Sequence, residues 1–187
     1  MAQKRKDLNG LISGFKASDL VFLDESGCNT DMTRRYTYSL GGSRAVDSAP
    51  LSKPKNTTIL SSIQLDGTLR YTTFSGGTTV ERFKRYLESD LLPHLNGNSV
   101  LIMDNMKSHH AKAVKNLLDS SEIRYIYLPP YSPDLNPIEK LWSKVKAFLR
   151  KFKARTLDAL PNAIQNAFHA VTVSDCSGWF RFCGYAL

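Results

Sequence analysis

The chain has 187 residues with a formal net charge of +8 at pH 7, and 42% of the residues are hydrophobic. This length and composition fit one globular domain and exclude a disordered tail or a fibrous repeat. The sequence also lacks an apolar run near the ~18–20 residues of a membrane span, an apolar segment after its charged start, and a C-x-x-C pair among its three cysteines. We therefore expect a soluble, basic protein of a reducing compartment, with no membrane partner and with a polyanion as the first candidate partner.

The N-terminal half is predicted to be mostly β-structure. Residues 1–18 are polar and basic, and two glycines interrupt any helical period, so they are expected to form a lead-in. The apolar run 20–23 predicts a strand buried on both faces. The segment 35–40 is rich in β-forming residues, which favours a strand followed by a loop. The runs 57–63 and 69–74 flank an Asp-Gly pair, which is a strong hairpin signal.

The C-terminal half is predicted to alternate helices with short strands. Apolar residues at three- and four-residue intervals predict helices over 80–91, 111–118, 137–152 and 157–171, with an aromatic tail after the last helix. Apolar runs predict strands at 100–103 and 123–128. Strands separated by a helix pair in parallel through right-handed crossovers. We therefore expect an α/β fold with a mixed sheet, three antiparallel strands and then parallel strands, and helices on both faces.

Two acidic residues, Asp24 and Asp104, each follow a predicted buried strand. If these strands are parallel neighbours, both carboxylates emerge at the same edge of the sheet. Two like charges held close are unfavourable unless a cation lies between them. Oxygen ligands without a nearby Cys or His cage favour Mg²⁺ or Mn²⁺ over zinc. Taken alone, each Asp is explained better as an ordinary turn residue.

Glu139 is the third acidic candidate. It lies three residues after Asn136, where a capping-box carboxylate binds the start of a helix, and Pro137 fits the first helical position. Against this structural role, the next sixteen residues contain seven basic residues and no acid: Lys140, Lys144, Lys146, Arg150, Lys151, Lys153 and Arg155. An acid that opens such a helix is typical of a metal ligand beside a phosphate-binding surface. A solvated lysine face explains the lysines singly, and both interpretations stay open.

Three motifs together resemble the catalytic domain of DDE transposases. They are Phe22-Leu23-Asp24-Glu25-Ser26, then Ile102-Met103-Asp104-Asn105 with His109 five positions past the Asp, and the proline-rich block from Leu128 to Trp142 that contains Asn136-Pro137-Ile138-Glu139. Thirty-four residues separate Asp104 from Glu139, a spacing typical of the bacterial insertion-sequence branch of the mariner superfamily, which the chain resembles more closely. The similarity extends from about residue 19 to the C-terminus, where residues 178–185 also match.

The resemblance implies an RNase H-like fold with a five-stranded sheet and a site in which Asp24, Asp104 and Glu139 are catalytic residues and metal ligands. It implies two Mg²⁺ or Mn²⁺ ions per site, which activate a water or a 3′-hydroxyl for in-line attack on a DNA phosphodiester. Asn105 and His109 match motif positions near the metals, as contacts to substrate or to the ligands. A turn Asn and a helix-start His explain these two residues equally well.

The expected organisation is a lead-in over 1–18, an RNase H-like DDE catalytic core over 19–155, and a C-terminal helix with an aromatic tail over 156–187 packed on the core. Full-length members of the family carry N-terminal helix-turn-helix modules that recognise the transposon ends. We therefore expect either the downstream frame of a frameshifted gene, with an upstream-frame helix-turn-helix protein as its partner, or a fragment. The other implied partners are transposon-end and target DNA and a second copy in a DNA-bound homodimer, at the nucleoid in the bacterial cytoplasm.

The basic residues fit a DNA backbone, because phosphate contacts are salt-dependent and largely sequence-blind. The candidates are Arg34, Arg35, Arg44, Lys53, Lys55, Lys140, Lys144 and Lys146. Trp142, at helical spacing with apolar neighbours, is expected in the core rather than stacked on a base. Packing is also the expected role of four tyrosines that alternate as strand residues do: Tyr36, Tyr38, Tyr125 and Tyr127.

Three functions are compatible with these features. The leading hypothesis is a metal-dependent transposase domain that cuts DNA at transposon ends and joins the ends to target DNA. A catalytically incompetent, truncated transposase that binds DNA or interferes with an intact transposase also fits the basic charge and the missing modules. A resolvase or RNA-cleaving nuclease of the same fold fits worst, because it leaves the block 128–142 unexplained.

Overall fold

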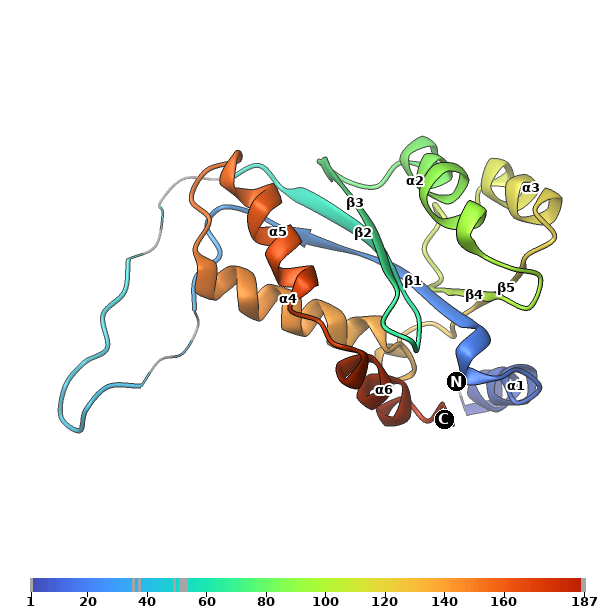
Figure 1. Ribbon diagram of the computed structural model, residues 1–187, viewed down its shortest axis with the longest axis horizontal. Helices are drawn as coiled ribbons and strands as arrows, with labels where there is room; N and C mark the ends of the chain where they lie inside the picture. The colour runs from blue at the N-terminus through green and yellow to red at the C-terminus, as the bar shows by residue number, and fades with distance from the viewer. Residues whose placement is uncertain (1, 35, 37, 49, 51–53, 186–187) are drawn as a thin grey trace.

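The computed structural model describes residues 2–34, 36, 38–48, 50 and 54–185. They form a five-stranded sheet in the order β3-β2-β1-β4-β5, with helices on both faces (Figure 1). The strands are β1 (Leu20–Cys28), β2 (Thr57–Ile63), β3 (Leu69–Ser75), β4 (Val100–Met103) and β5 (Arg124–Tyr127). The helices are α1 (Ala2–Ile12), α2 (Val80–Tyr86), α3 (Lys112–Ser120), α4 (Ile138–Phe152), α5 (Ala159–His169) and α6 (Val173–Phe182). In this part of the chain no helix is both long and apolar enough to cross a membrane.

The sheet confirms the predicted mixed topology. β1 pairs antiparallel with β2, and β2 pairs antiparallel with β3. On the other side of β1, β4 pairs in parallel with β1, and β5 pairs in parallel with β4. The hairpin between β2 and β3 turns at the predicted Asp-Gly pair, where Gly67 has a φ of 87° and Asp66 accepts a hydrogen bond from the Thr68 amide. β1 and β4 are parallel neighbours with Leu23 opposite Met103. The two strands therefore bring Asp24 and Asp104 to the same edge of the sheet.

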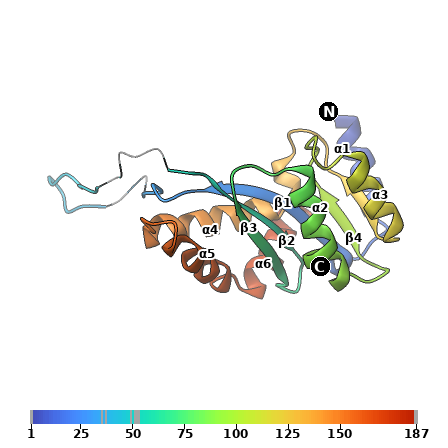
Figure 2. The ribbon, with the colours of Figure 1, turned by 90° about the horizontal axis from the view of Figure 1, so that it is seen from above.

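The side chains of β1 alternate between two apolar cores. Leu20 and Phe22 pack with α4, α5 and α6, whereas Val21 and Leu23 pack with α2 and α3. Successive side chains of a strand point to opposite faces of the sheet, which is why one continuous apolar run supplies both cores. Figure 2 shows α4, α5 and α6 on one side of the sheet and α2 and α3 on the other.

The N-terminal lead-in that the sequence predicted is a helix instead. α1 spans Ala2–Ile12, and its Leu8 and Ile12, one helical turn apart, are buried in the same core as Phe22. Helical segments of this length gain most of their stability from tertiary packing of an apolar face. That packing outweighs the helix-weakening effect of Gly10, whose Cβ position is open.

The C-terminal aromatic tail is also a helix, α6, rather than an irregular segment. Thr172 and Asp175 form a capping box at its start, in which each side chain accepts a hydrogen bond from the backbone of the other residue. The ring of Phe180 meets the ring of Phe22 edge-on at a centroid distance of 5.3 Å. α6 therefore belongs to the core on the α4 side of the sheet.

The β-rich segment at 35–40 is not a strand in its described part. Residues 36 and 38–40 have no regular structure. The exposed fractions of Tyr36 and Tyr38 are 91% and 103%, so the prediction that these two rings pack is wrong. Arg35 lies outside the described residues. The described part of the segment between β1 and β2 extends away from the sheet (Figure 1), and the side chains of Tyr36, Tyr38, Leu40 and Val46 on it are exposed.

Candidate active site

Asp24 lies in the part of β1 that runs beyond the last paired residue of β4. Its carboxylate is buried, with an exposed fraction of 7%. Oδ1 accepts a hydrogen bond from the Glu25 amide at 2.7 Å, and Oδ2 accepts one from Trp142 Nε1 at 3.1 Å. Burial, together with the negative charges of Asp104 and Glu139, raises the pKa of Asp24 from 3.8 to about 7. Asp24 shares one cavity with these two acids.

Asp104 follows β4 directly and sits beside a buried histidine. Its Oδ1 accepts a hydrogen bond from the Met106 amide at 3.1 Å and lies 2.8 Å from His109 Nδ1. Burial alone raises the pKa of Asp104, but the hydrogen bond and the charge of His109 outweigh burial and hold the pKa below its ordinary value. Asp104 therefore stays ionised more readily than Asp24.

Glu139 completes the set from the first turn of α4. Asp24, Asp104 and Glu139 all line one cavity of about 160 Å³, whose wall is formed by the segment from Leu128 to Asn136. The three acids come from two neighbouring strands and one helix, far apart in the sequence. The structure thus brings together the three residues that the sequence motifs singled out.

Asn136 has a different role from the helix cap that the sequence suggested. α4 begins at Ile138 with Pro137 as its cap residue and without a side-chain cap hydrogen bond. Asn136 is 3% exposed and lines the carboxylate cavity, and its Oδ1 has no hydrogen-bond partner among the described residues. A buried carbonyl oxygen without a partner costs about 1–3 kcal/mol. This oxygen is a further acceptor available to whatever occupies the cavity.

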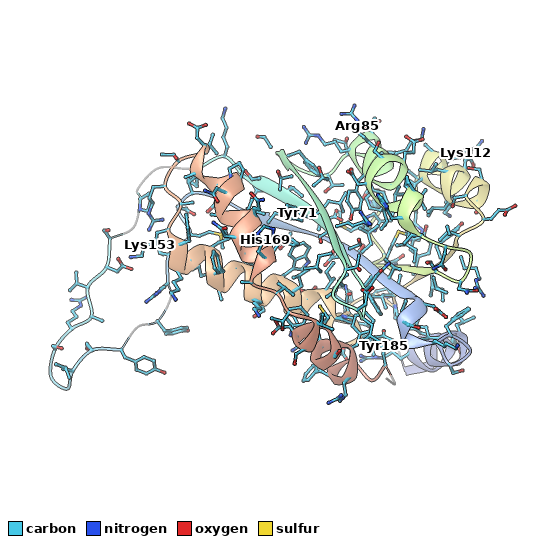
Figure 3. The ribbon with its side chains drawn as sticks, viewed as in Figure 1. Tyr71, Arg85, Lys112, Lys153, His169 and Tyr185 are labelled. Atoms are coloured by element: carbon cyan, nitrogen blue, oxygen red, sulfur yellow. The ribbon has the colours of Figure 1, made fainter. Side chains whose placement is uncertain are left out.

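The C-terminal segment supports the wall of the cavity. The Tyr185 hydroxyl donates a hydrogen bond to the Leu135 carbonyl at 2.6 Å, and its ring lies 5.0 Å from the ring of Phe22 (Figure 3). Leu135 directly precedes Asn136. The end of the chain therefore fixes the segment that carries Asn136 and leads into Glu139.

Trp142 and Glu25 take part in the site although sequence reasoning gave them no role there. Trp142 is in the core, as predicted, but its indole also donates to Asp24. Its position three residues after Glu139, on the same helix face, is a signal that could have revealed this contact. Glu25 Oε2 lies 3.2 Å from His109 Nε2. No spacing rule links these two residues, which are 84 positions apart.

The other two near-site candidates, His109 and Asn105, lie in different surroundings. His109 contacts Asp104 directly. Asn105 lies outside the carboxylate cavity, in a neighbouring groove that it shares with Asp7, Leu8 and Leu11 of α1, and its Oδ1 contacts His110. The ring of His110 packs on Tyr127. The side chain of His109 therefore contacts an acid of the site, whereas the side chain of Asn105, although adjacent to Asp104 in sequence, contacts His110.

The basic candidates lie in distinct environments. Lys144 pairs with Asp175 of α6, and Lys140 lies over the ring of Phe182 at 3.9 Å. Lys146 lines an open groove with Arg150 and the residues from Gly27 to Thr33. Lys153 pairs with Asp47 at the base of the segment that extends from the sheet (Figure 3). Three further candidates are exposed on that segment, Arg34, Arg44 and Lys55, while Arg35 and Lys53 lie outside the described residues.

The chemistry of the carboxylate cavity fits a hard divalent cation. Its donors are carboxylate oxygens and the unpartnered amide oxygen of Asn136, which are the ligands that Mg²⁺ and Mn²⁺ prefer. Within the described ranges, no group of three or more His, Cys, Asp or Glu side chains is arranged as a ready-made metal site. The residues of the cavity fit such an ion by type and by location.

Comparison with known proteins gives the same picture. A family model described as DDE superfamily endonuclease matches residues 19–161. Over 75 residues the chain is 33% identical to the Tc1 transposase of Caenorhabditis elegans and 31% identical to the Tcb2 transposase of Caenorhabditis briggsae. Each match covers 40% of this chain but only 28% of the relative.

Solved structures share the fold at low sequence identity. A pre-cleavage Mos1 transpososome matches with a TM-score of 0.81 and 18% identity, over 96% of this chain and 57% of that chain. A Mos1 transposase catalytic domain with Mg matches with a TM-score of 0.68 and 16% identity, over 96% of this chain and 85% of that one. These matches confirm the predicted RNase H-like fold. With two neighbouring strands and a helix bringing three acids to one cavity, and with a family model that spans residues 19–161, the chain belongs to the DDE superfamily of endonucleases and has Tc1/mariner transposases among its relatives.

Proposed function

We propose that this chain is the catalytic domain of a DNA transposase that cleaves phosphodiesters at transposon ends and joins the ends to target DNA. The observation that carries the proposal is the convergence of Asp24, Asp104 and Glu139 on one cavity. The likeness to the Tc1 transposase and to the Mos1 transpososome supports the choice of DNA transposition over other phosphodiester chemistry.

The cofactor in this proposal is Mg²⁺ or Mn²⁺, with two ions per site. Asp24, Asp104 and Glu139 are the proposed ligands, and two of the similar structures are Mos1 catalytic domains with Mg and with Mn. When bound, the ions supply Lewis-acid activation of the attacking water or 3′-hydroxyl and stabilisation of the leaving oxygen. The protein contributes the orientation of the ligands: Trp142 and the Glu25 amide hold Asp24, and His109 and the Met106 amide hold Asp104.

The proposed partners are transposon-end and target DNA, contacted by a homodimer assembled on the DNA. Paired-end complexes and a transpososome are among the similar Mos1 structures, which supports a paired assembly. The groove with Lys146 and Arg150 and the exposed Arg34 are the proposed phosphate contacts. Lys140 and Lys144 contribute charge from positions held by Phe182 and Asp175. Recognition of end sequences is assigned to helix-turn-helix segments encoded outside these 187 residues, in the same frame or an upstream one.

A finer proposal is that the protein comes from the bacterial insertion-sequence branch of the mariner superfamily and acts at the nucleoid. The spacing between Asp104 and Glu139 and the block from Leu128 to Trp142 support it. The DNA just upstream of the Met1 codon tests this assignment. An overlapping frame with helix-turn-helix segments and a slippery site is the expected result, and a eukaryotic flanking sequence would contradict it.

The test of the main proposal is cleavage of a labelled duplex that carries the terminal repeat of the element, in Mg²⁺ or Mn²⁺. Asp24→Asn, Asp104→Asn and Glu139→Gln are each expected to abolish nicking while DNA binding is kept. Asp158→Asn, at an exposed position of the helix α5 start, is the matched control and is expected to cleave normally. Unchanged nicking in the three site variants would refute the assignment. Any hydrolysis that depends on the three acids excludes the alternative of a truncated, catalytically incompetent transposase.

A further inference from the structure

Glu25 follows Asp24 directly in the sequence, but its side chain lies on the opposite face of the sheet. Because side chains alternate along a strand, Asp24 faces α4 with Phe22, and Glu25 faces α2 and α3 with Leu23. On that side Glu25 Oε2 lies 3.2 Å from His109 Nε2, and the side chain of Glu25 is only 11% exposed. Its other oxygen, Oε1, is buried and has no hydrogen-bond partner in the part of the chain that the structure describes. Among the described residues, the contact with His109 is thus the one hydrogen bond of this buried carboxylate.

His109 is held rigidly between two carboxylates. Its side chain is fully buried, and its ring stacks on Phe83 at a centroid distance of 4.2 Å and an interplanar angle of 24°. The Tyr127 hydroxyl donates a hydrogen bond to the His109 carbonyl at 2.9 Å, which fixes the backbone. Nε2 faces Glu25, and Nδ1 lies 2.8 Å from Asp104 Oδ1. With the ring plane fixed by Phe83 and one nitrogen fixed by Glu25, the direction of the other nitrogen is determined.

The contact with His109 fixes the Asp104 carboxylate from one side. The Met106 amide donates to Oδ1, and His109 Nδ1 lies 2.8 Å from the same oxygen and 3.4 Å from the Asp104 carbonyl oxygen, while Asp104 also lines the carboxylate cavity. Hydrogen bonds of this kind orient metal-ligating carboxylates, and loss of such a partner typically costs about tenfold to hundredfold in metal affinity.

We propose that Glu25 is a positioning residue which, through the ring of His109, holds the Asp104 carboxylate in the orientation that binds the divalent cation. The inference rests on the proposed function, since it assumes that Asp104 is a ligand. It extends the site from the three acids on one face of the sheet to a supporting chain, Glu25–His109–Asp104, that crosses to the other face. This positioning role requires a Glu25 side chain that is long enough to hydrogen-bond to His109, and it does not require the negative charge of Glu25.

Two substitutions of Glu25 test the length of its side chain and its negative charge separately. Glu25→Gln keeps the length of the side chain and an acceptor oxygen but removes the charge, and it is expected to bind Mn²⁺ with nearly the wild-type affinity. Glu25→Asp keeps the charge but shortens the side chain by one methylene, and it is expected to bind Mn²⁺ about tenfold to hundredfold more weakly. Isothermal titration calorimetry of Mn²⁺ into the metal-free protein measures both affinities without any cleavage step. A loss in the Gln variant with none in the Asp variant would overturn the proposal.

Three further variants identify the path of the effect. His109→Gln keeps a donor that can reach Glu25 but loses the contact with Asp104, so it is expected to weaken Mn²⁺ binding as Glu25→Asp does. The double variant is expected to bind no more weakly than His109→Gln, because Glu25 acts through His109; additive losses would overturn the chain of action. Thr172→Ala removes only the capping box at the start of α6, which involves none of Glu25, His109 and Asp104. It is expected to lower the melting temperature and leave the affinity unchanged, and the same pattern in Glu25→Asp would mean a merely structural role.

Asp104→Asn distinguishes a failure of this inference from a failure of the proposed function. If Asp104→Asn loses Mn²⁺ binding while Glu25→Asp and His109→Gln keep it, the metal site stands and the positioning role is refuted. If Asp104→Asn binds Mn²⁺ as the wild type does, the proposed ligand set itself is refuted. Far-ultraviolet circular dichroism of each variant establishes that the fold is retained before any titration is compared.

Discussion

Replacing Asp24 by Asn is expected to make the metal-free protein more stable at neutral pH and less stable in acid. Burial raises the pKa of Asp24 from 3.8 to about 7 in the folded protein. Between these pH values the folded state binds a proton that the unfolded state has released, so the free energy of unfolding of the wild type falls as the pH rises from about 4 to about 7. A difference of about three pKa units corresponds to about 4 kcal/mol at 1.36 kcal/mol per unit.

The substitution also has a cost that does not depend on pH. An amide keeps only one acceptor oxygen, so one of the hydrogen bonds from the Glu25 amide and Trp142 Nε1 is lost, at about 1–3 kcal/mol. Asp24→Asn is therefore expected to be less stable than the wild type by that amount near pH 4. At pH 8 the variant is expected to be more stable by about 1–3 kcal/mol, because the removed charge outweighs the lost hydrogen bond.

Urea unfolding in EDTA, followed by circular dichroism from pH 4.5 to pH 8, measures this difference. Asp158→Asn, at an exposed position, is the matched control and is expected to follow the wild type at every pH. A stability difference between Asp24→Asn and the wild type that stays constant over this pH range would refute the reasoning. Adding Mn²⁺ at a hundredfold excess over its Kd is expected to stabilise the wild type by about 2.7 kcal/mol and the variant by much less.

Two further predictions concern the elements that support the site. Thr172→Ala is expected to lower the free energy of unfolding by about 1 kcal/mol, because the capping box of α6 is lost. Thr172→Ser is expected to restore most of this free energy in the same denaturant titration. Equal stability of the Ala variant and the wild type would contradict a stabilising role of the capping box. Tyr185→Phe is expected to cost about 0.5–1.5 kcal/mol and to speed amide hydrogen exchange at Leu135 and Asn136, because the hydrogen bond to the Leu135 carbonyl is lost; unchanged exchange at these amides would contradict an anchoring role.

The sheet and the three acids could be predicted because their signals are local. The runs ending at Leu23 and Met103 are apolar at every position, which only a strand covered on both faces requires, and each run is followed directly by an acid. Glu139 was found through the motif around it. Burial raises the pKa of Asp24 most, and the charges of Asp104 and Glu139 raise it further. Asp104 escapes this effect because His109, which the sequence could not pair with it, offsets its burial.

The parts that sequence reasoning missed depend on contacts between distant residues. α1 is a helix because Leu8 and Ile12 pack in a core that later parts of the chain form. Residues 1–18 alone carry no signal of that core. The contact of Glu25 with His109 joins a strand to the segment that follows another strand. α6 is a different case, because Thr172 and Asp175 form a local capping-box signal at its start. The aromatic composition of the residues that follow made this signal hard to recognise.

The overhang of β1 past the end of β4 has a consequence for how this chain tolerates changes in length. Asp24 and Glu25 serve opposite faces of the sheet only because they are consecutive in one strand. Deleting or inserting a single residue between Leu20 and Asp24 would exchange the faces of the two acids and dismantle the site. Insertions between Ser39 and Asp47, where the described chain has left the sheet, leave that alternation untouched. Reporter peptides and natural length variation therefore belong in the projecting segment and never in the first half of β1.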